Sequence, residues 1–124
     1  MLNPSEGISG VEDFIVETIR SAGPNPCPPV IVGVGVGGTM DKAALLAKQA
    51  LLREVGSVHA DPFWADAEAR LLARINALNI GPAGFGGRTT ALSVHILTYP
   101  THIAGLPVAV NIGCHATRRQ TAIL

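Results

Sequence analysis

The sequence has few cysteines, few charges and no long apolar run, and each shortage excludes a class of protein. Two cysteines in 124 residues, with no signal-peptide pattern at the N-terminus, exclude a disulfide-rich secreted domain. They favour a cytoplasmic location with free or metal-bound thiols. The net charge is zero and no basic stripe occurs, which argues against binding to nucleic acid. No apolar stretch reaches the roughly 18 residues that a membrane span requires.

The chain is nevertheless rich in apolar residues. It is 48% hydrophobic and only 15% charged, and its mean hydropathy is +0.36. That composition is too apolar for a disordered protein and high for a small monomer. We therefore expect one domain with an apolar face that meets another chain or a missing part of the same chain. The simplest such assembly is a two-fold homo-oligomer.

Clusters of glycine and proline divide the sequence into regular segments. Apolar spacing and capping residues predict three helices, which begin near Ser9, Thr39 and Asp61. Three β-branched or alternating stretches predict strands, of which the last two are expected to pair. The order α-β-α-α-β-β predicts an α+β fold in which a mixed sheet is packed with helices, as a partial domain. The expected segments are helices from 9 to 22, 40–54 and 62–78, and strands 29–36, 91–97 and 106–112.

A glycine pattern follows the first predicted strand. Gly33, Gly35 and Gly38 fit G-x-G-x-x-G, the dinucleotide fingerprint, between a strand and a helix. The fingerprint also needs a second strand that ends in an acidic residue. Asp61 lies at about the right distance but is interpreted as the cap of the next helix. Nucleotide binding stays open as an alternative, because small residues at a helix N-terminus form an anion-binding corner.

The two cysteines have no C-x-x-C neighbour, so a zinc site is not indicated. Either could be a buried structural thiol. Cys27, however, lies in a proline-rich loop beside the glycine turn, and cysteine followed by proline occurs among iron–sulfur ligands. From the residues alone, both interpretations of Cys27 and Cys114 remain open.

The remaining candidates are histidines and arginines. His59 and His95 have no evident partners and are interpreted as ordinary surface or half-buried residues. His102 lies in a loop between two predicted strands, where functional residues concentrate. Arg118 and Arg119 are interpreted as solvated side chains, although either could hold a carboxylate in a bidentate manner.

Three long motifs resemble a known family. They are CPPVIVGVGVGGTMDKAALLAKQALLR (27–53), NIGPAGFGGRTTALSVHI (79–96) and HIAGLPVAVNIGCHATRR (102–119). In this order they resemble the α-type catalytic domain of class I fumarases and L-tartrate dehydratases, which are iron–sulfur hydro-lyases. The resemblance runs from about residue 8 to residue 119. It implies a lyase that reversibly removes water from a four-carbon 2-hydroxy dicarboxylic acid, converting malate to fumarate or tartrate to oxaloacetate.

The resemblance also implies the site. A [4Fe–4S] cluster is held by three cysteines, of which Cys27 and Cys114 match the second and third, and His102 matches a histidine that contacts the substrate. The first cysteine belongs to a stretch absent from this sequence. A β-type subunit supplies the remainder of the active site, including the proton-abstracting residue, so no catalytic residue is assigned here. Residues 1–124 are therefore expected to be the C-terminal part of an α-type domain, inactive alone and without a complete cluster site.

Two geometric expectations follow from the resemblance. The sulfurs of Cys27 and Cys114 should lie within about 5 to 8 Å of each other, on metal–thiolate distances of about 2.3 Å. His102 should lie on the same side of the domain, with its ring facing a cleft.

The alternative to the hydro-lyase function is a non-catalytic fragment or assembly module that lacks a complete cluster site. The sequence does not distinguish fumarate from tartrate chemistry.

Overall fold

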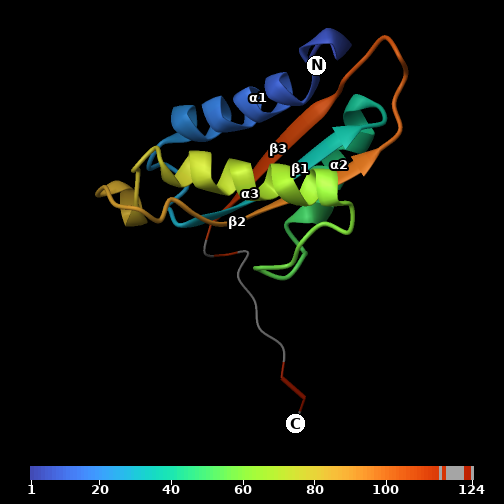
Figure 1. Cartoon of the computed structure of the whole chain (residues 1–124). Helices are drawn as coiled ribbons and strands as arrows, with labels where there is room; N and C mark the ends of the chain where they lie inside the picture. The colour runs from blue at the N-terminus through green and yellow to red at the C-terminus, as the bar shows by residue number, and fades with distance from the viewer. Residues whose placement is uncertain (115, 117–121, 124) are drawn as a thin grey trace.

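The computed structural model describes residues 1–114, 116 and 122–123. It confirms the α+β class and the element order (Figure 1). The candidate arginines Arg118 and Arg119 lie outside the described residues. The elements are η1 (Pro4–Glu6), α1 (Gly7–Ala22), β1 (Val30–Gly37), α2 (Met40–Ala50), α3 (Pro62–Asn76), η2 (Pro82–Gly84), β2 (Ala91–Tyr99) and β3 (Val108–Gly113).

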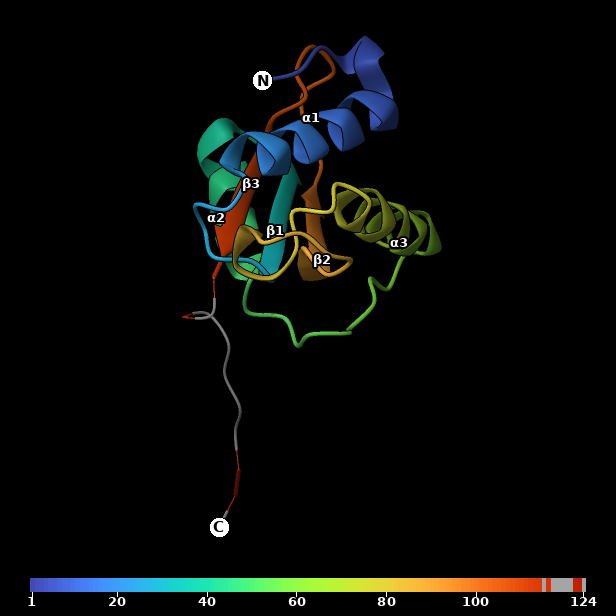
Figure 2. The same cartoon turned by 90° about the vertical axis from the view of Figure 1, so that its left-hand side faces the viewer.

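The sheet has the strand order β2-β1-β3. Strand β1 runs parallel to β2, from Val30 opposite Ala91 to Gly37 opposite Tyr99, and antiparallel to β3. The expected direct pairing of the last two strands is therefore wrong, because β1 lies between them (Figure 2). Central β1 is buried along its whole length, which explains its continuous run of valine, isoleucine and glycine.

Helices cover both faces of the sheet. The core on one face joins α1 and α3 to the even-numbered valines of β1. On the other face, α2 approaches the glycines of β1 very closely. A Cβ atom at Gly35 would lie 2.0 Å from the backbone oxygen of Ala43, and one at Gly33 would lie 2.4 Å from that of Ala47. The glycine pattern therefore has a packing reason: a side chain at either position would push α2 off the sheet.

The predicted helix starts are confirmed at two of three places. Asp61 caps α3, where its Oδ1 accepts a hydrogen bond from the Phe63 backbone N–H at 2.9 Å. Thr39 is the N-cap of α2. The expected start at Ser9 is wrong, because η1 precedes α1 and the Glu6 carboxylate already accepts from the Asn3 N–H at 2.7 Å. A capping box of Asn3 and Glu6 therefore acts six residues before the expected one.

The inner face of β2 holds a buried histidine. The side chain of His95 is fully buried, with Nε2 2.6 Å from Ser93 Oγ and Nδ1 3.1 Å from the Ala50 carbonyl. The interpretation of His95 as a surface or half-buried residue without partners is therefore wrong. Ser93 could have indicated a partner for His95, because residues two apart in a strand lie on the same face.

Side chains from α3 and the segment before it cover the outer edge of β2. A Glu68 carboxylate oxygen accepts from the Ile96 N–H at 2.8 Å and from the Arg53 guanidinium at 2.7 Å. Arg53 also donates to the Ile96 carbonyl at 3.2 Å. This ion pair occupies hydrogen-bonding groups that an adjacent strand would use, and so it blocks edge pairing.

Candidate functional site

The two ends of β1 present different chemistry. We call one the cysteine end: it comprises the loop before β1 (23–29), the loop before β2 (77–90) and the end of β3 with Cys114. We call the other the pocket end: it comprises the carboxyl ends of β1 and β2, the loop 100–107 and the first turns of α1 and α3. Figure 1 shows the two ends at opposite sides of the molecule.

The sheet register brings the two cysteines to the same end. Cys27 lies three residues before Val30, where β1 begins. Cys114 directly follows Gly113, which pairs with Ile31 in the antiparallel ladder. Both thiols are free of disulfides; Cys27 is exposed and Cys114 half-exposed. The distance between their sulfurs stays a prediction.

The two loops of the cysteine end lie against each other. The Ala83 N–H donates to the Pro28 carbonyl at 2.7 Å. A Cβ atom at Gly84 would lie 2.3 Å from Pro24 Cβ. The Gly81 N–H donates to Thr90 Oγ1 at 3.1 Å, which closes the second loop on itself. The peptide next to Cys27 is therefore fixed by a loop far away in the sequence.

Backbone strain gathers at this same end. Among the described residues, the non-glycine residues with positive φ are Cys27 at 57°, Asn79 at 56° and Ala83 at 53°. All three lie in the two loops of the cysteine end. Such conformations cost about 1–3 kcal/mol each and persist where surrounding structure enforces them, commonly at functional sites. The strain marks this end of the sheet as the candidate site, independently of the thiols.

The cysteine end suits an iron–sulfur cluster only in part. Thiolates are the usual ligands of such clusters, and both thiols here are accessible. Within the described part of the chain, no three histidine, cysteine or acidic side chains gather in a way that could hold a metal ion. The two cysteines therefore fit a part of such a ligand set, and the described residues do not complete it.

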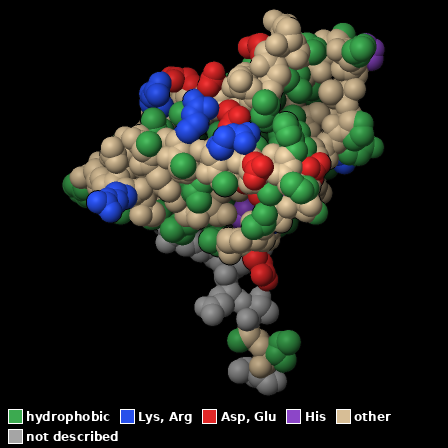
Figure 3. Space-filling view, in the orientation of Figure 1, with side chains coloured by type: hydrophobic (Ala, Val, Ile, Leu, Met, Phe, Trp, Pro, Cys, Tyr) green, Lys and Arg blue, Asp and Glu red, His purple; other side chains and the backbone are tan. Residues whose placement is uncertain are grey.

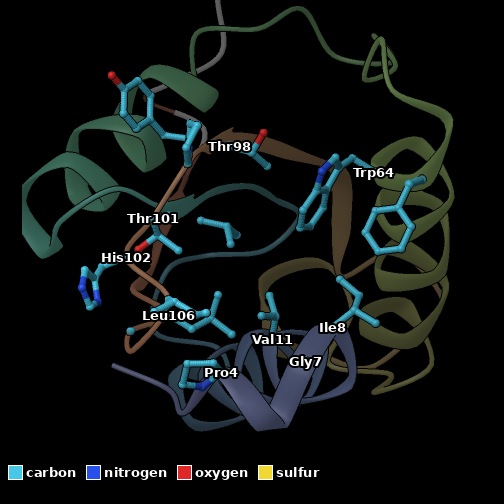
Figure 4. Close-up of a pocket in the computed structure, with 16 residues that line it drawn as sticks. Pro4, Gly7, Ile8, Val11, Trp64, Thr98, Thr101, His102 and Leu106 are labelled. Carbon is cyan, nitrogen blue, oxygen red and sulfur yellow. The ribbon is translucent and has the colours of Figure 1, made fainter.

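The pocket end holds a cavity of about 490 Å³ (Figure 4). Its wall is mostly apolar and includes Ile8, Val11 and Leu106. Trp64 also lines it, with Phe63 in an edge-to-face ring contact at 5.0 Å between centroids. The carboxyl ends of parallel strands are a common place for ligands in sheets covered by helices. The few polar groups in the wall indicate an apolar occupant.

His102 lies at the pocket end. Its Nδ1 accepts from the Ala104 N–H at 3.0 Å and its carbonyl accepts from the Gly105 N–H at 3.1 Å, so it closes a turn. His102 is one of the residues that line the cavity, but it is exposed and its ring points outward in Figure 4. The expectation that His102 shares a side with the cysteines is therefore wrong within one chain. The six residues of β3 lie between His102 and Cys114, and at about 3.3 Å per residue they separate the two ends by about 20 Å.

The glycine turn at the start of α2 is occupied by the chain itself. The Gly37 N–H donates to the Pro107 carbonyl at 2.9 Å, and the Gly38 N–H to the Pro100 carbonyl at 3.2 Å. Thr39 Oγ1 donates to the Asp41 carboxylate, and this hydrogen bond holds the pKa of Asp41 below its ordinary value. These donors already have partners, which disfavours the nucleotide alternative.

Two features of the site were missed in the sequence. One is Trp64, the single tryptophan of the chain, in the first turn of α3 beside the cavity. The other is the strain at Asn79 and Ala83. A tryptophan in a chain with only 4% aromatic residues was a usable signal. The positive φ of Ala83 leaves no signal in the residue type.

The chain folds as an α+β domain with helices on both faces of a mixed sheet and both cysteines at one end of that sheet. Comparison with known proteins identifies its family. The family model described as "Fumarate hydratase (Fumerase)" matches residues 1–123. The chain therefore belongs to the fumarate hydratase family.

Named relatives agree with that assignment. The chain is 52% identical, over 96% of its length and 42% of the relative, to the "Putative L(+)-tartrate dehydratase subunit alpha" of Methanocaldococcus jannaschii. It is 43% identical, over 100% of its length and 41% of the relative, to the L(+)-tartrate dehydratase subunit alpha of Escherichia coli K12. The chain thus spans about two-fifths of the length of these curated relatives. No helix among its described residues has the length and apolar character needed to cross a membrane.

Proposed function

We propose that this chain is the C-terminal part of the α-type catalytic domain of a hydro-lyase. The complete enzyme reversibly removes water from a four-carbon 2-hydroxy dicarboxylic acid, either tartrate or malate. Membership of the fumarate hydratase family supports the reaction class, and relatives named as tartrate dehydratase α subunits favour tartrate. Because these relatives are named as α subunits, a second, β-type subunit is the proposed partner. Two cysteines that form no disulfide agree with a cytoplasmic enzyme.

One observation carries the proposal: the sheet register brings Cys27 and Cys114 to one end, where the backbone is also strained. We propose that these thiolates are two ligands of a [4Fe–4S] cluster. Such a cluster supplies a Lewis acid that polarises the C–O bond of the departing hydroxyl. The chain's own contribution is to hold the two thiols in fixed positions. The loop 77–90 does this for Cys27 through the Ala83–Pro28 hydrogen bond.

His102 belongs to the same proposal in a different way. Because β1 separates it from the cysteines of its own chain, it can contact their substrate only from a second copy of the chain. We therefore propose a homo-oligomer in which the His102 loop of one copy reaches the cysteine end of another. The exposure of the loop supports this arrangement, since Ile103 is 89% exposed beside His102.

The test uses the complete α subunit, produced anaerobically with its β partner. We expect it to dehydrate L-tartrate or L-malate, followed as oxaloacetate or fumarate formed. Iron and acid-labile sulfide should be present in the same preparation. A complete α/β preparation that carries a cluster and dehydrates neither acid would refute the proposed reaction. One with neither cluster nor activity would favour the non-catalytic assembly module.

A further inference from the structure

We propose that Arg88 binds a carboxylate of the substrate at the cysteine end. This inference rests on the proposed function, because it assigns the recognition of a dicarboxylate to a named residue of the same site. It arises from the distribution of charge in the chain and from the packing of two loops.

The first argument is position. Strands β1 and β2 are parallel, and their first paired residues are Val30 and Ala91. Cys27 and Arg88 each lie three residues before that pair, in the two loops that pack against each other. The Val30 N–H donates to the Thr90 carbonyl at 2.9 Å, which holds the ends of the two loops together. The two side chains therefore start from the same end of adjacent strands.

The second argument is charge. All nine acidic residues of the chain lie within residues 1–68, so the remainder has no acidic side chain. The two loops of the cysteine end, 23–29 and 77–90, together with β3 and Cys114, contain a single charged side chain, which is Arg88. In Figure 3, the left-hand end of the molecule, over the loop between α3 and β2, shows blue and no red. A dianionic substrate would meet a positive charge there and no negative charge from these segments.

The third argument concerns partners. Among the described residues, the arginines other than Arg88 are all paired with acids: Arg20 with Glu17, Arg53 with Glu68, Arg70 with Glu12 and Arg74 with Asp13. No such ion pair is recorded for Arg88 within that part of the chain. A guanidinium presents donors in a planar fork that matches a carboxylate. Arg88 is therefore available for a ligand, whereas the other four serve the fold.

The fourth argument is the rigidity of its support. Asn76 Oδ1 accepts from the N–H groups of Thr90 and Ala91, both at 2.9 Å. The Gly86 N–H donates to the Ile80 carbonyl at 2.8 Å. Arg88 lies between these fixed points, so its backbone is already ordered before a ligand binds. Such preorganisation reduces the entropy that binding must overcome.

The test compares Arg88→Gln and Arg88→Lys with wild type in the complete α/β enzyme. The control is Arg20→Gln, which removes the same charge from the exposed end of α1. We expect Arg88→Gln to raise KM for the dicarboxylate by roughly 10- to 100-fold, the usual effect of losing a charge-assisted hydrogen bond. Iron and acid-labile sulfide should stay at the wild-type level. Arg88→Lys should recover part of the loss, and Arg20→Gln should leave KM unchanged.

The outcomes separate two failures. A wild-type KM in Arg88→Gln, with an active wild-type enzyme, overturns the role of Arg88 and leaves the proposed reaction standing. An equal loss of cluster and activity in Arg88→Gln also overturns it, because the residue would then be structural. A wild-type enzyme with a cluster but no dehydratase activity overturns the proposed reaction, and with it the assignment of Arg88.

Discussion

The cysteine end and the pocket end of the sheet differ in chemistry, in strain and in what they can bind. At the cysteine end lie two thiols and Arg88, which forms no ion pair with the part of the chain that the structure describes. Its loops have positive φ angles at Cys27, Asn79 and Ala83. At the pocket end, a mostly apolar cavity is surrounded by exposed hydrophobic side chains such as Phe63 and Ile103. Backbone strain is therefore found where we propose chemistry, and apolar surface where we propose assembly.

The two ends also differ in the role of their glycine clusters, which is not the role that the sequence motif suggests. The glycines of β1 suggest a phosphate site, yet Gly33 and Gly35 serve the approach of α2. The N–H groups of Gly37 and Gly38 are bonded to carbonyls of the chain itself. The second glycine cluster, at 81–87, supports the loop of Cys27 instead. Glycines therefore allow close helix packing and turn formation around β1, whereas at the cysteine end they support the loop that holds Cys27.

The largest expected effect comes from the ligand thiols. Cys27→Ser and Cys114→Ser in the complete α/β enzyme should each lower dehydratase activity by more than about 100-fold, since even indirect partners of a metal site cost 10- to 100-fold. Iron content should fall in parallel, measured by elemental analysis. Asn25→Ser, in the same exposed loop as Cys27, is the matched control and should keep both. Normal iron content in either cysteine variant would break the assignment of the cysteine end.

The next largest effect concerns His102, and it tests whether the pocket end of one copy lies against the cysteine end of another. His102→Asn should lower kcat by roughly 100-fold while the cluster content stays unchanged, a loss in the range seen for acid–base and contact residues. If the histidine acts from a second copy, mixing Cys27→Ser subunits with His102→Asn subunits should restore activity. A two-fold dimer mixed at random should recover about a quarter of the wild-type activity. If subunit exchange is confirmed and activity does not recover, His102 would act within its own chain. That result would contradict the separation of His102 from the cysteines in this structure.

A third prediction concerns the sheet that connects the two ends. Gly35→Ala should lower the free energy of unfolding by about 2–3 kcal/mol, because the new Cβ would meet backbone atoms of α2 that cannot rotate away. Gly105→Ala is the control, since its Cβ would lie 3.5 Å from Met1 Sδ, an ordinary contact, and its effect should stay within about 0.5 kcal/mol. Urea unfolding followed by circular dichroism measures both. Equal stability of the two variants would mean that α2 does not depend on close approach.

The smallest effect is electrostatic and lies at the pocket end. The Thr39 hydroxyl lowers the pKa of Asp41, so this hydrogen bond stabilises the folded chain above the ordinary pKa of aspartate. That contribution is lost as the pH falls through the lowered pKa of the folded state. Thr39→Val should therefore raise the pKa of Asp41, as measured by NMR titration of its carboxylate carbon. An unchanged Asp41 titration in Thr39→Val would assign the shift to the backbone N–H groups of Asp41 and Lys42.

The sequence predicts the elements better than their arrangement. Helix formers, the Asp61-Pro62 start and the β-branched strands locate most elements within a few residues. The pairing of β1 between β2 and β3 was missed, because strand order depends on contacts that lie far apart in the sequence. The register of β2 was not predicted either. A bulge makes Val30 pair with Ala91 and Ile31 with Ser93, which leaves Leu92 exposed.

The candidate site divides in the same way. Cys27 and Cys114 could be chosen from the resemblance, and the antiparallel pairing of β1 with β3 brings them to one end. His102 could be chosen too, but its position could not. A loop residue only a short way from Cys114 in the sequence lies at the opposite end, because β3 runs between them. Arg88 needed both the charge pattern and the packing of the two loops.

The most direct test is a crystal structure of the anaerobically prepared α/β enzyme, with diffraction data collected at the iron absorption edge. We expect anomalous density for iron at the cysteine end, with the sulfurs of Cys27 and Cys114 each about 2.3 Å from an iron atom, the ordinary metal–thiolate distance. The pocket end of the same chain should show no iron. Iron bound elsewhere, or sulfurs that lie apart with no iron between them in a preparation shown to contain the cluster, would contradict the account.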